Sequence, residues 1–207
     1  MRLPIALEGW PFILPAFALV LLCALLQWRG AAAATLALAL FVTWFFRDPA
    51  RTIPADPETL VSPADGRVTD VVVHADGGAR ISIFLSIFNV HVNRAPVAGE
   101  VIEVTRLPGL FLDARNPEAS TRNVQSSVTV RTPRGDVRFV QITGLIARRI
   151  VCHLTPGAIV ERGERYGLIR FGSRVDLFLP PAAEPAVRVG DRVRGGSDVI
   201  ARWRIAP

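Results

Sequence analysis

Hydrophobic residues fill two long runs at the start of the chain, residues 10–28 and 31–46, with only Arg29 and Gly30 between them. Each run approaches the roughly 20 apolar residues that a helix needs to cross a bilayer, the second being somewhat shorter. A break of two residues leaves no room for a soluble loop, so the pattern predicts a tight helical hairpin. A cleaved signal peptide is the alternative, which we disfavour because the first run is long and a second follows at once.

After residue 46 the pattern changes to short alternating or apolar runs separated by glycine, proline and aspartate. The proline-rich residues 47–58 indicate the boundary between an anchor, residues 1–46, and a second domain, residues 47–207. No stretch of that domain has a convincing helical period, so we predict a mainly β fold, a compact sandwich or barrel-like arrangement of sheets. The expected strands are residues 66–74, 80–86, 100–107, 124–132, 136–143, 147–154, 168–171, 174–179 and 198–204.

Two segments of the second domain share one turn spacing. Residues 157–163 and 190–196 both read Gly-x-x-Val-x-x-Gly, which resembles the turns of biotinyl and lipoyl carrier domains. Those domains hold their cofactor on a lysine, and this chain has none. The resemblance therefore indicates lipoyl-like turns in a small barrel-like fold and not a carrier function.

Composition narrows the partners and cofactors. The formal net charge is +6, and all 24 basic residues are arginine. The phenylalanines lie inside apolar runs instead of alternating with basic residues, so we expect an anionic lipid surface and no nucleic acid. A chain without lysine cannot hold pyridoxal phosphate as a Schiff base. The two cysteines and three histidines have no ligand spacing, so no metal is expected.

Three polar residues supply the parts of a nucleophilic site. Asp65 lies in a tight turn before an expected strand, His91 follows another strand, and Ser173 follows Gly172. Singly, each has an ordinary structural interpretation as a turn aspartate, a backbone-bonded histidine or a strand bulge. Together they match a common arrangement in which an acid orients a histidine that deprotonates a serine. The glycine allows backbone angles that other residues avoid.

Five short motifs around these residues resemble the short bacterial and archaeal form of the phosphatidylserine decarboxylase family. In chain order they are Phe46-Arg47-Asp48-Pro49-x-Arg51, Ser62-Pro63-Ala64-Asp65-Gly66, Phe88-Asn89-Val90-His91-Val92-Asn93-Arg94, Gly144-Leu145-Ile146-Ala147-Arg148-Arg149-Ile150 and Phe171-Gly172-Ser173-Arg174-Val175-Asp176. Longer forms of the family have Leu-Gly-Ser-Thr at the cleavage site, whereas Phe171 and Arg174 flank the Gly-Ser pair here. Longer forms also often have a second histidine at the position of Phe88.

The resemblance implies a proenzyme that cleaves itself between Gly172 and Ser173. Asp65 orients His91, and His91 takes the proton of Ser173, whose oxygen then attacks the Gly172 carbonyl. Residue 173 is left as a pyruvoyl group, the expected cofactor. Its carbonyl accepts the amine of phosphatidylserine as a Schiff base, and loss of CO2 yields phosphatidylethanolamine. His91 is also our candidate for the acid that protonates the carbanion.

The same resemblance gives the expected chain composition. Cleavage yields a β chain of residues 1–172 and an α chain of residues 173–207, which stay together as partners. The family suggests a dimer of these heterodimers.

The expected location is the inner cell membrane. Arg47 and Arg51 directly follow the hairpin, which favours the cytoplasmic side for the catalytic domain. The polar residues 108–123 form a candidate active-site loop. Within it, Arg115, Arg122 and Asn123 are the candidate contacts of the lipid headgroup.

Two other function classes compete with this interpretation. A non-enzymatic, membrane-anchored adaptor with lipoyl-like turns explains the anchor and the turns, but it leaves the polar motifs unexplained. A serine hydrolase without self-cleavage needs a Gly-x-Ser-x-Gly elbow, which Phe171 at the first glycine position excludes.

Overall fold

A computed structural model describes residues 4–145, 149–170 and 172–204. The chain separates into two compact units, Met1–Ala50 and Arg51–Pro207. The predicted strand at 147–154 and the motif beginning at Gly144 extend into residues 146–148, and the cleavage motif includes Phe171. Those residues lie outside the described part of the chain.

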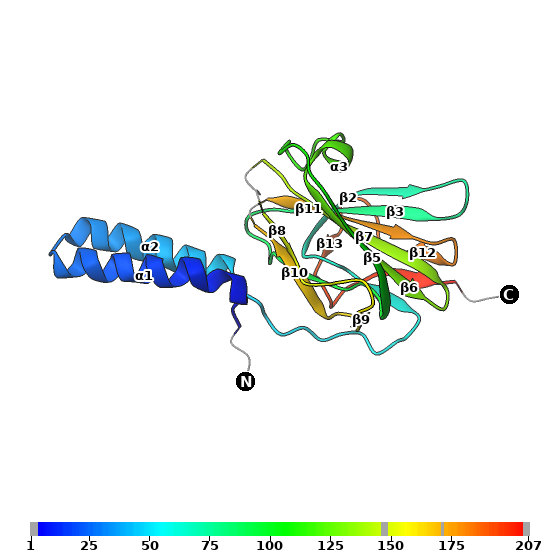
Figure 1. Cartoon of the computed structure of the whole chain (residues 1–207), viewed down its shortest axis with the longest axis horizontal. Coiled ribbons are helices and arrows are strands. Elements are labelled where there is room, and N and C mark those ends of the chain that lie inside the picture. Colours follow the sequence, from blue (N-terminus) through cyan, green and yellow to red (C-terminus); the bar gives the residue numbers. More distant parts are fainter. Residues whose placement is uncertain (1–3, 146–148, 171, 205–207) are drawn as a thin grey trace. The chain divides into compact units, whose positions relative to one another are not determined.

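The first unit is a helical hairpin, as the two apolar runs predict (Figure 1). It consists of a 3-10 turn, η1 (Leu7–Gly9), followed by α1 (Trp10–Leu25) and α2 (Arg29–Phe45). The predicted position of the break is wrong. Arg29 and Gly30 begin α2. The chain turns before them, where Gln27 adopts a left-handed φ of 58°.

Most large apolar side chains of the hairpin are exposed, among them Leu14, Leu21 and Leu25. Among the described residues, the helical stretch Leu7–Leu25 has the length and hydropathy needed to cross a membrane, whereas α2 is shorter. An apolar helix with exposed side chains is consistent with contact between the hairpin and lipid.

The second unit is mainly β, as predicted, and its described residues include a short helix, α3 (Ala119–Arg122). Its described strands are β1 (Thr59–Val61), β2 (Gly66–Val73), β3 (Ala79–Leu85), β4 (Val92–Arg94), β5 (Gly99–Leu107), β6 (Gln125–Thr132), β7 (Gly135–Ile142), β8 (Ile150–Cys152), β9 (Ile159–Val160), β10 (Arg165–Ile169), β11 (Ser173–Leu179), β12 (Ala183–Pro185), β13 (Arg192–Val193) and β14 (Val199–Trp203).

These strands form one large sheet and two small ones (Figure 1). The order in the large sheet is β13-β2-β3-β11-β7-β6-β5-β9, and the small sheets are β4-β10-β8 and β1-β14-β12. The inner face of the large sheet is apolar, and Ile83, Val175 and Phe139 on it are fully buried. They belong to one core with Tyr166 of β10 and Ile200 of β14, so both small sheets pack against this inner face.

The register of the large sheet gives it two distinct edges. At the first, the starts of β2, β11 and β6 lie beside the ends of β3, β7 and β5; we call this the Ser173 edge. Its cross-strand pairs are Arg67–Phe84, Leu85–Ser173, Arg174–Ile142, Ile142–Gln125 and Gln125–Leu107. At the opposite end, the far edge, the pairs include Val73–Ala79, Ala79–Leu179, Thr132–Gly135 and Glu100–Arg131.

The repeated Gly-x-x-Val-x-x-Gly segments form turns of the expected kind. Gly157, Gly163, Gly190 and Gly196 all have positive φ, between 76° and 101°. The central valines, Val160 in β9 and Val193 in β13, are both buried. The left-handed backbone explains why glycine occupies these positions.

Candidate functional site

The bond between Gly172 and Ser173 lies at the start of β11, on the Ser173 edge. Gly172 has a left-handed φ of 57°, a conformation that side-chain-bearing residues rarely adopt. Ser173 pairs with Leu85 of β3 and is fully buried, with 0% of its surface exposed. Its Oγ has no hydrogen-bond partner among the described residues. A buried hydroxyl without a partner is uncommon and suggests a chemical role.

The carbonyl of Gly172 lies directly against Gly144, which follows the end of β7. A Cβ atom added to Gly144 would lie less than 3.0 Å from the Gly172 oxygen and 3.3 Å from the Ala114 side chain. The backbone of Gly144 therefore closes one side of the bond that is expected to break. Sequence reasoning included Gly144 in a motif but assigned it no role.

His91 lies in the connection between β3 and β4 and is fully buried. Its carbonyl accepts a hydrogen bond from the Ile169 N–H of β10 at 3.3 Å. The imidazole Nδ1 lies 2.9 Å from the carbonyl oxygen of Asn89. Because a carbonyl only accepts, Nδ1 carries the proton in this pair, and Nε2 is the basic nitrogen of the neutral ring.

Asp65 directly precedes β2 at the same edge, with its side chain 12% exposed. Arg51 Nη2 donates to both carboxylate oxygens at 2.8 Å, and the Gly195 N–H donates to Oδ1 at 2.8 Å. The pattern alone did not identify Arg51 as the partner, although Arg51 belongs to the first matched motif. Three hydrogen bonds from these two donors hold this carboxylate in one orientation.

The topology brings the segments of the three predicted residues to one part of the fold. The Asp65 turn adjoins Phe84 near the end of β3, and the next residue of β3, Leu85, pairs with Ser173. The strand after His91 approaches the same turn, since the Arg94 N–H donates to the Pro63 carbonyl at 2.9 Å. The relay from Asp65 through His91 to Ser173 remains a prediction.

Arg174 replaces the threonine of the longer forms, and its environment explains why a charge is tolerated. Its guanidinium is buried on the outer face of the sheet and donates to the carboxylate of Asp176 at 2.6 and 3.1 Å. It also donates to Ser82 Oγ at 2.7 Å. This pairing anchors the residue that directly follows the expected cleavage point. The sequence motif alone did not indicate this ion pair between Arg174 and Asp176.

The loop from residue 108 to residue 123 crosses the Ser173 edge. Its centre places Ala114 beside Gly144 and the Arg115 guanidinium 6.0 Å from the Phe84 ring. Arg115 and Arg122 are exposed and pair with Asp113 and Glu118 at 2.6 and 2.7 Å. The hydrogen bonds from the Arg115 side chain and N–H lower the pKa of the Asp113 carboxyl.

Asn123, the third predicted headgroup contact, is buried and bound within the protein. Its Oδ1 accepts from the Leu112 N–H at 2.9 Å, and its Nδ2 donates to the carbonyls of Leu112 and Thr143 at 2.9 and 2.8 Å. These bonds favour a structural role in the loop over contact with a headgroup.

A cavity of about 1130 Å³ opens beside the Asp65 turn. Its wall combines two acids, Asp65 and Asp198, with the rings of Phe84 and Phe88 and with four arginines, Arg67, Arg115, Arg192 and Arg194. A basic and partly aromatic cavity suits an anionic, amphipathic ligand. Within the described part of the chain, no group of three or more histidine, cysteine, aspartate or glutamate side chains is arranged to hold a metal.

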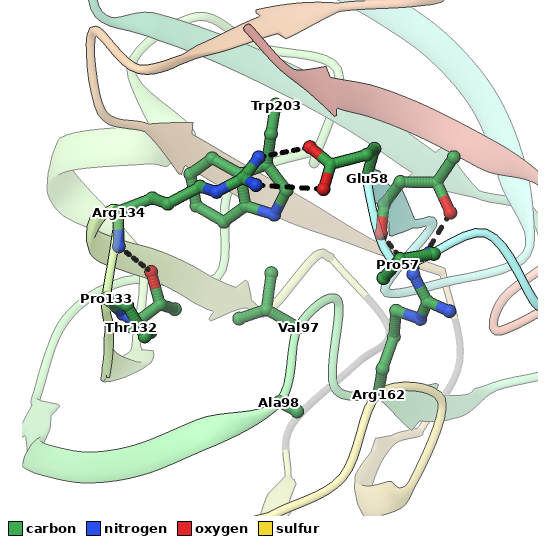
Figure 2. A pocket seen from close by; sticks show the side chains of 10 residues that line it. Pro57, Glu58, Val97, Ala98, Thr132, Pro133, Arg134, Arg162 and Trp203 are labelled. Atoms are coloured by element: carbon green, nitrogen blue, oxygen red, sulfur yellow. Dashed lines mark hydrogen bonds and ion pairs between the residues drawn. The ribbon is translucent and has the colours of Figure 1, made fainter. Parts of the chain in front are cut away.

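A second cavity, of about 420 Å³, lies at the far edge. Figure 2 shows the Arg134 guanidinium directed at the Glu58 carboxylate beside the Trp203 ring. Arg162 donates to the carbonyls of Pro54, Asp56 and Thr59 at 2.6 Å each. The arginines of this cavity are engaged with the protein itself, and the cavity contains none of the predicted catalytic residues.

Comparisons with known proteins identify the family of the chain. The family model described as phosphatidylserine decarboxylase matches residues 38–201. A protein of Pelobacter propionicus is 47% identical, and one of Geotalea uraniireducens is 46% identical; the alignments cover 96% and 95% of both chains. A Nitrosomonas eutropha protein is 45% identical over 97% of this chain and 95% of its own. All three are named phosphatidylserine decarboxylase proenzyme. The chain therefore belongs to the phosphatidylserine decarboxylase family.

Proposed function

We propose that this chain is a membrane-attached proenzyme that cleaves itself between Gly172 and Ser173 and then decarboxylates phosphatidylserine to phosphatidylethanolamine. The observation that supports self-cleavage most directly is the local state of that bond. Gly172 is left-handed, and the Ser173 hydroxyl beside it is buried without a partner among the described residues. Such a hydroxyl is held near a carbonyl without a competing hydrogen bond. Membership of the family supports the substrate.

Cleavage proceeds in three steps, which are acyl transfer, elimination and hydrolysis. His91 takes the Ser173 hydroxyl proton, and Oγ attacks the Gly172 carbonyl carbon; the C–N bond breaks, the amine is protonated, and an ester forms. Removal of the Ser173 Cα proton then expels the Gly172 carboxylate, which leaves a dehydroalanine at residue 173. Water adds to the tautomeric imine of that residue, and ammonia leaves, which produces the pyruvoyl group.

The chain's own residues fit the roles that this scheme requires. With its proton on Nδ1 toward Asn89, neutral His91 has the basic nitrogen that a general base needs. Asp65, fixed by Arg51 and Gly195, supplies negative charge near the same edge and favours the imidazolium that forms during attack. Arg174 holds the start of β11 in place after the chain is cut, through its bonds to Asp176.

For decarboxylation, a pyruvoyl group at residue 173 would supply the ketone needed for Schiff-base chemistry with the substrate amine and an electron sink for the loss of CO2. The chain lacks lysine, so a carbonyl made from its own backbone replaces pyridoxal phosphate. The basic cavity beside Asp65 receives the anionic headgroup, with Arg115 at its wall. His91 then returns a proton to the product carbon.

The hairpin attaches the enzyme to the cytoplasmic face of the inner membrane in this proposal. Its exposed apolar side chains contact lipid, and the arginine-rich second unit favours an anionic leaflet. The cleaved α and β chains stay associated, since β11 pairs with β3 and β7 on both sides. A dimer of heterodimers is the assembly we expect.

The direct test is an activity assay on the purified full-length chain in detergent. Phosphatidylserine labelled in its serine carboxyl should release labelled CO2, and Ser173→Ala should release none. A carbonyl reagent such as phenylhydrazine should inactivate the wild type. Full activity after that treatment would exclude the pyruvoyl mechanism, whereas no release of CO2 from a cleaved wild type would exclude this substrate.

A further inference from the structure

Gly144 has a steric reason for being a glycine at the Ser173 edge. Its backbone is not left-handed, so its φ does not require glycine. The requirement comes from space, because an added Cβ would lie less than 3.0 Å from the Gly172 oxygen. Real Cβ atoms essentially never come that close. The atom that would have to move is the backbone oxygen of the bond expected to be cleaved.

The surroundings of Gly144 are held by the loop that crosses this edge. Thr143, its neighbour, donates both its N–H and its hydroxyl to the Val124 carbonyl at 3.1 Å. Asn123 Nδ2 donates to the Thr143 carbonyl at 2.8 Å and also binds Leu112. The buried carboxamide of Asn123 thus joins the loop and the end of β7 into one unit.

We infer that Gly144 is a positioning residue for self-cleavage and that Asn123 fixes the backbone beside Gly144 through its hydrogen bond to the Thr143 carbonyl. Together they form a seat for the Gly172 carbonyl, which leaves the carbonyl carbon accessible to Ser173 Oγ. This inference rests on the proposed self-cleavage and adds the residues that fix the electrophile. A methyl group at Gly144 displaces the carbonyl from the seat, and a displacement of about 1 Å slows an intramolecular attack about 100-fold.

Gly144→Ala is the principal test, and Gly99→Ala is its matched control. A Cβ at Gly99 would also lie less than 3.0 Å from a backbone oxygen, that of Arg131, but at the far edge. Both variants are made in the full-length chain, and cleavage is followed by gel and mass spectrometry after synthesis in a cell-free system. We expect Gly144→Ala to cleave about 100-fold more slowly than wild type. Gly99→Ala should cleave at the wild-type rate even where its melting temperature falls further.

Hydroxylamine identifies the step that Gly144 affects. This nucleophile cuts the ester that follows attack by Ser173 and leaves a hydroxamate on Gly172. If the seat acts before attack, Gly144→Ala yields no hydroxamate. A hydroxamate that accumulates in Gly144→Ala would overturn the inference, because the ester then forms and only elimination is slow.

Asn123→Ser keeps the inference testable if Gly144→Ala does not fold. It removes the bond to Thr143 but leaves Gly144 unchanged, so we expect cleavage roughly 10-fold slower than wild type without added hydroxamate. Wild-type cleavage rates in both Gly144→Ala and Asn123→Ser contradict the seat while leaving self-cleavage intact. A wild type that stays whole under the same conditions contradicts the proposed self-cleavage itself.

Discussion

The two edges of the large sheet differ at one buried polar group, the Ser173 hydroxyl. At the far edge, Arg162 binds three backbone carbonyls, and the Arg134 guanidinium pairs with Glu58. At the Ser173 edge, the serine hydroxyl is buried without a partner in the described part of the chain, and Gly172 is left-handed. The Ser173 edge also pairs groups such as Asp65 and Asn123, but it leaves the hydroxyl of the proposed nucleophile without a partner among the described residues.

This difference has an energetic meaning. An unpartnered buried hydroxyl costs about 1–3 kcal/mol relative to one with a hydrogen bond. Fully paired groups elsewhere in the same sheet offset a local cost of this kind, and such strain is typical of reactive sites. The comparison predicts that changes at the Ser173 edge affect chemistry, whereas changes at the far edge affect stability.

The largest expected effect is that of Ser173→Ala. The methyl group fits a site that already lacks a hydrogen-bond partner in the described structure, so the fold should be retained. Cleavage and decarboxylation should both disappear. Circular dichroism and gel analysis of the purified variant provide the check, and a cleaved Ser173→Ala chain would contradict the assignment of the nucleophile.

His91→Ala should also abolish cleavage, because the buried imidazole is the proposed base. His74→Ala is the matched control, since His74 is exposed in the turn between β2 and β3 at the far edge. We expect the control to cleave like wild type. Normal cleavage by His91→Ala, measured in the same gel assay, would remove His91 from the processing step.

Arg162→Ala should lower stability without slowing cleavage. The variant loses hydrogen bonds from a charged group to the carbonyls of Pro54, Asp56 and Thr59. We expect the free energy of unfolding to fall by roughly 2–4 kcal/mol. Urea denaturation in the uncleaved Ser173→Ala background measures it. Arg134→Ala is the control: its pair with Glu58 is exposed, so we expect little change. A large loss of cleavage in Arg162→Ala would contradict the prediction that changes at the far edge affect stability and not chemistry.

Tyr166→Phe should have the smallest effect, and that effect should depend on pH. Burial raises the pKa of Tyr166 well above its ordinary value of 10.0, and its hydroxyl lacks a partner among the described residues. Above about pH 10 the unfolded chain loses this proton while the folded chain keeps it, so wild-type stability falls.

The phenylalanine variant does not have this loss. Near neutral pH it should already exceed the parent in free energy of unfolding by about 1–3 kcal/mol, because it lacks the buried hydroxyl without a partner among the described residues. Its advantage should grow as pH rises above about 10. Urea titrations at several pH values, again in the Ser173→Ala background, measure the difference. A constant difference across this range would show that Tyr166 ionises normally.

Hydrophobic patterning predicted much of this fold because long strands repeat every two residues. The expected strands at 66–74 and 124–132 differ from β2 and β6 by one residue at one end. Short elements such as β4 and α3 escaped prediction, since three or four residues give no measurable period. The hairpin turn was misplaced because helix α2 accommodates Arg29 and Gly30 in its exposed first turn.

The site was predictable as a set of residue types but not as a set of contacts. Asp65 could be identified in its motif, yet its ion pair with Arg51 depends on how a proline-rich segment folds back. Asn123 was expected to contact a headgroup, and its three internal hydrogen bonds became visible only in the structure. The role of Gly144 depends on what its missing side chain would touch, which no local pattern encodes.

The most direct test of the central claim is the mass of the purified full-length chain under denaturing conditions. Self-cleavage predicts two polypeptides, residues 1–172 with a free carboxylate on Gly172 and residues 173–207 with a blocked amino terminus. The second should be lighter by one ammonia than the unmodified fragment, because Ser173 has become a pyruvoyl group. A single intact chain that nevertheless decarboxylates phosphatidylserine would contradict this account.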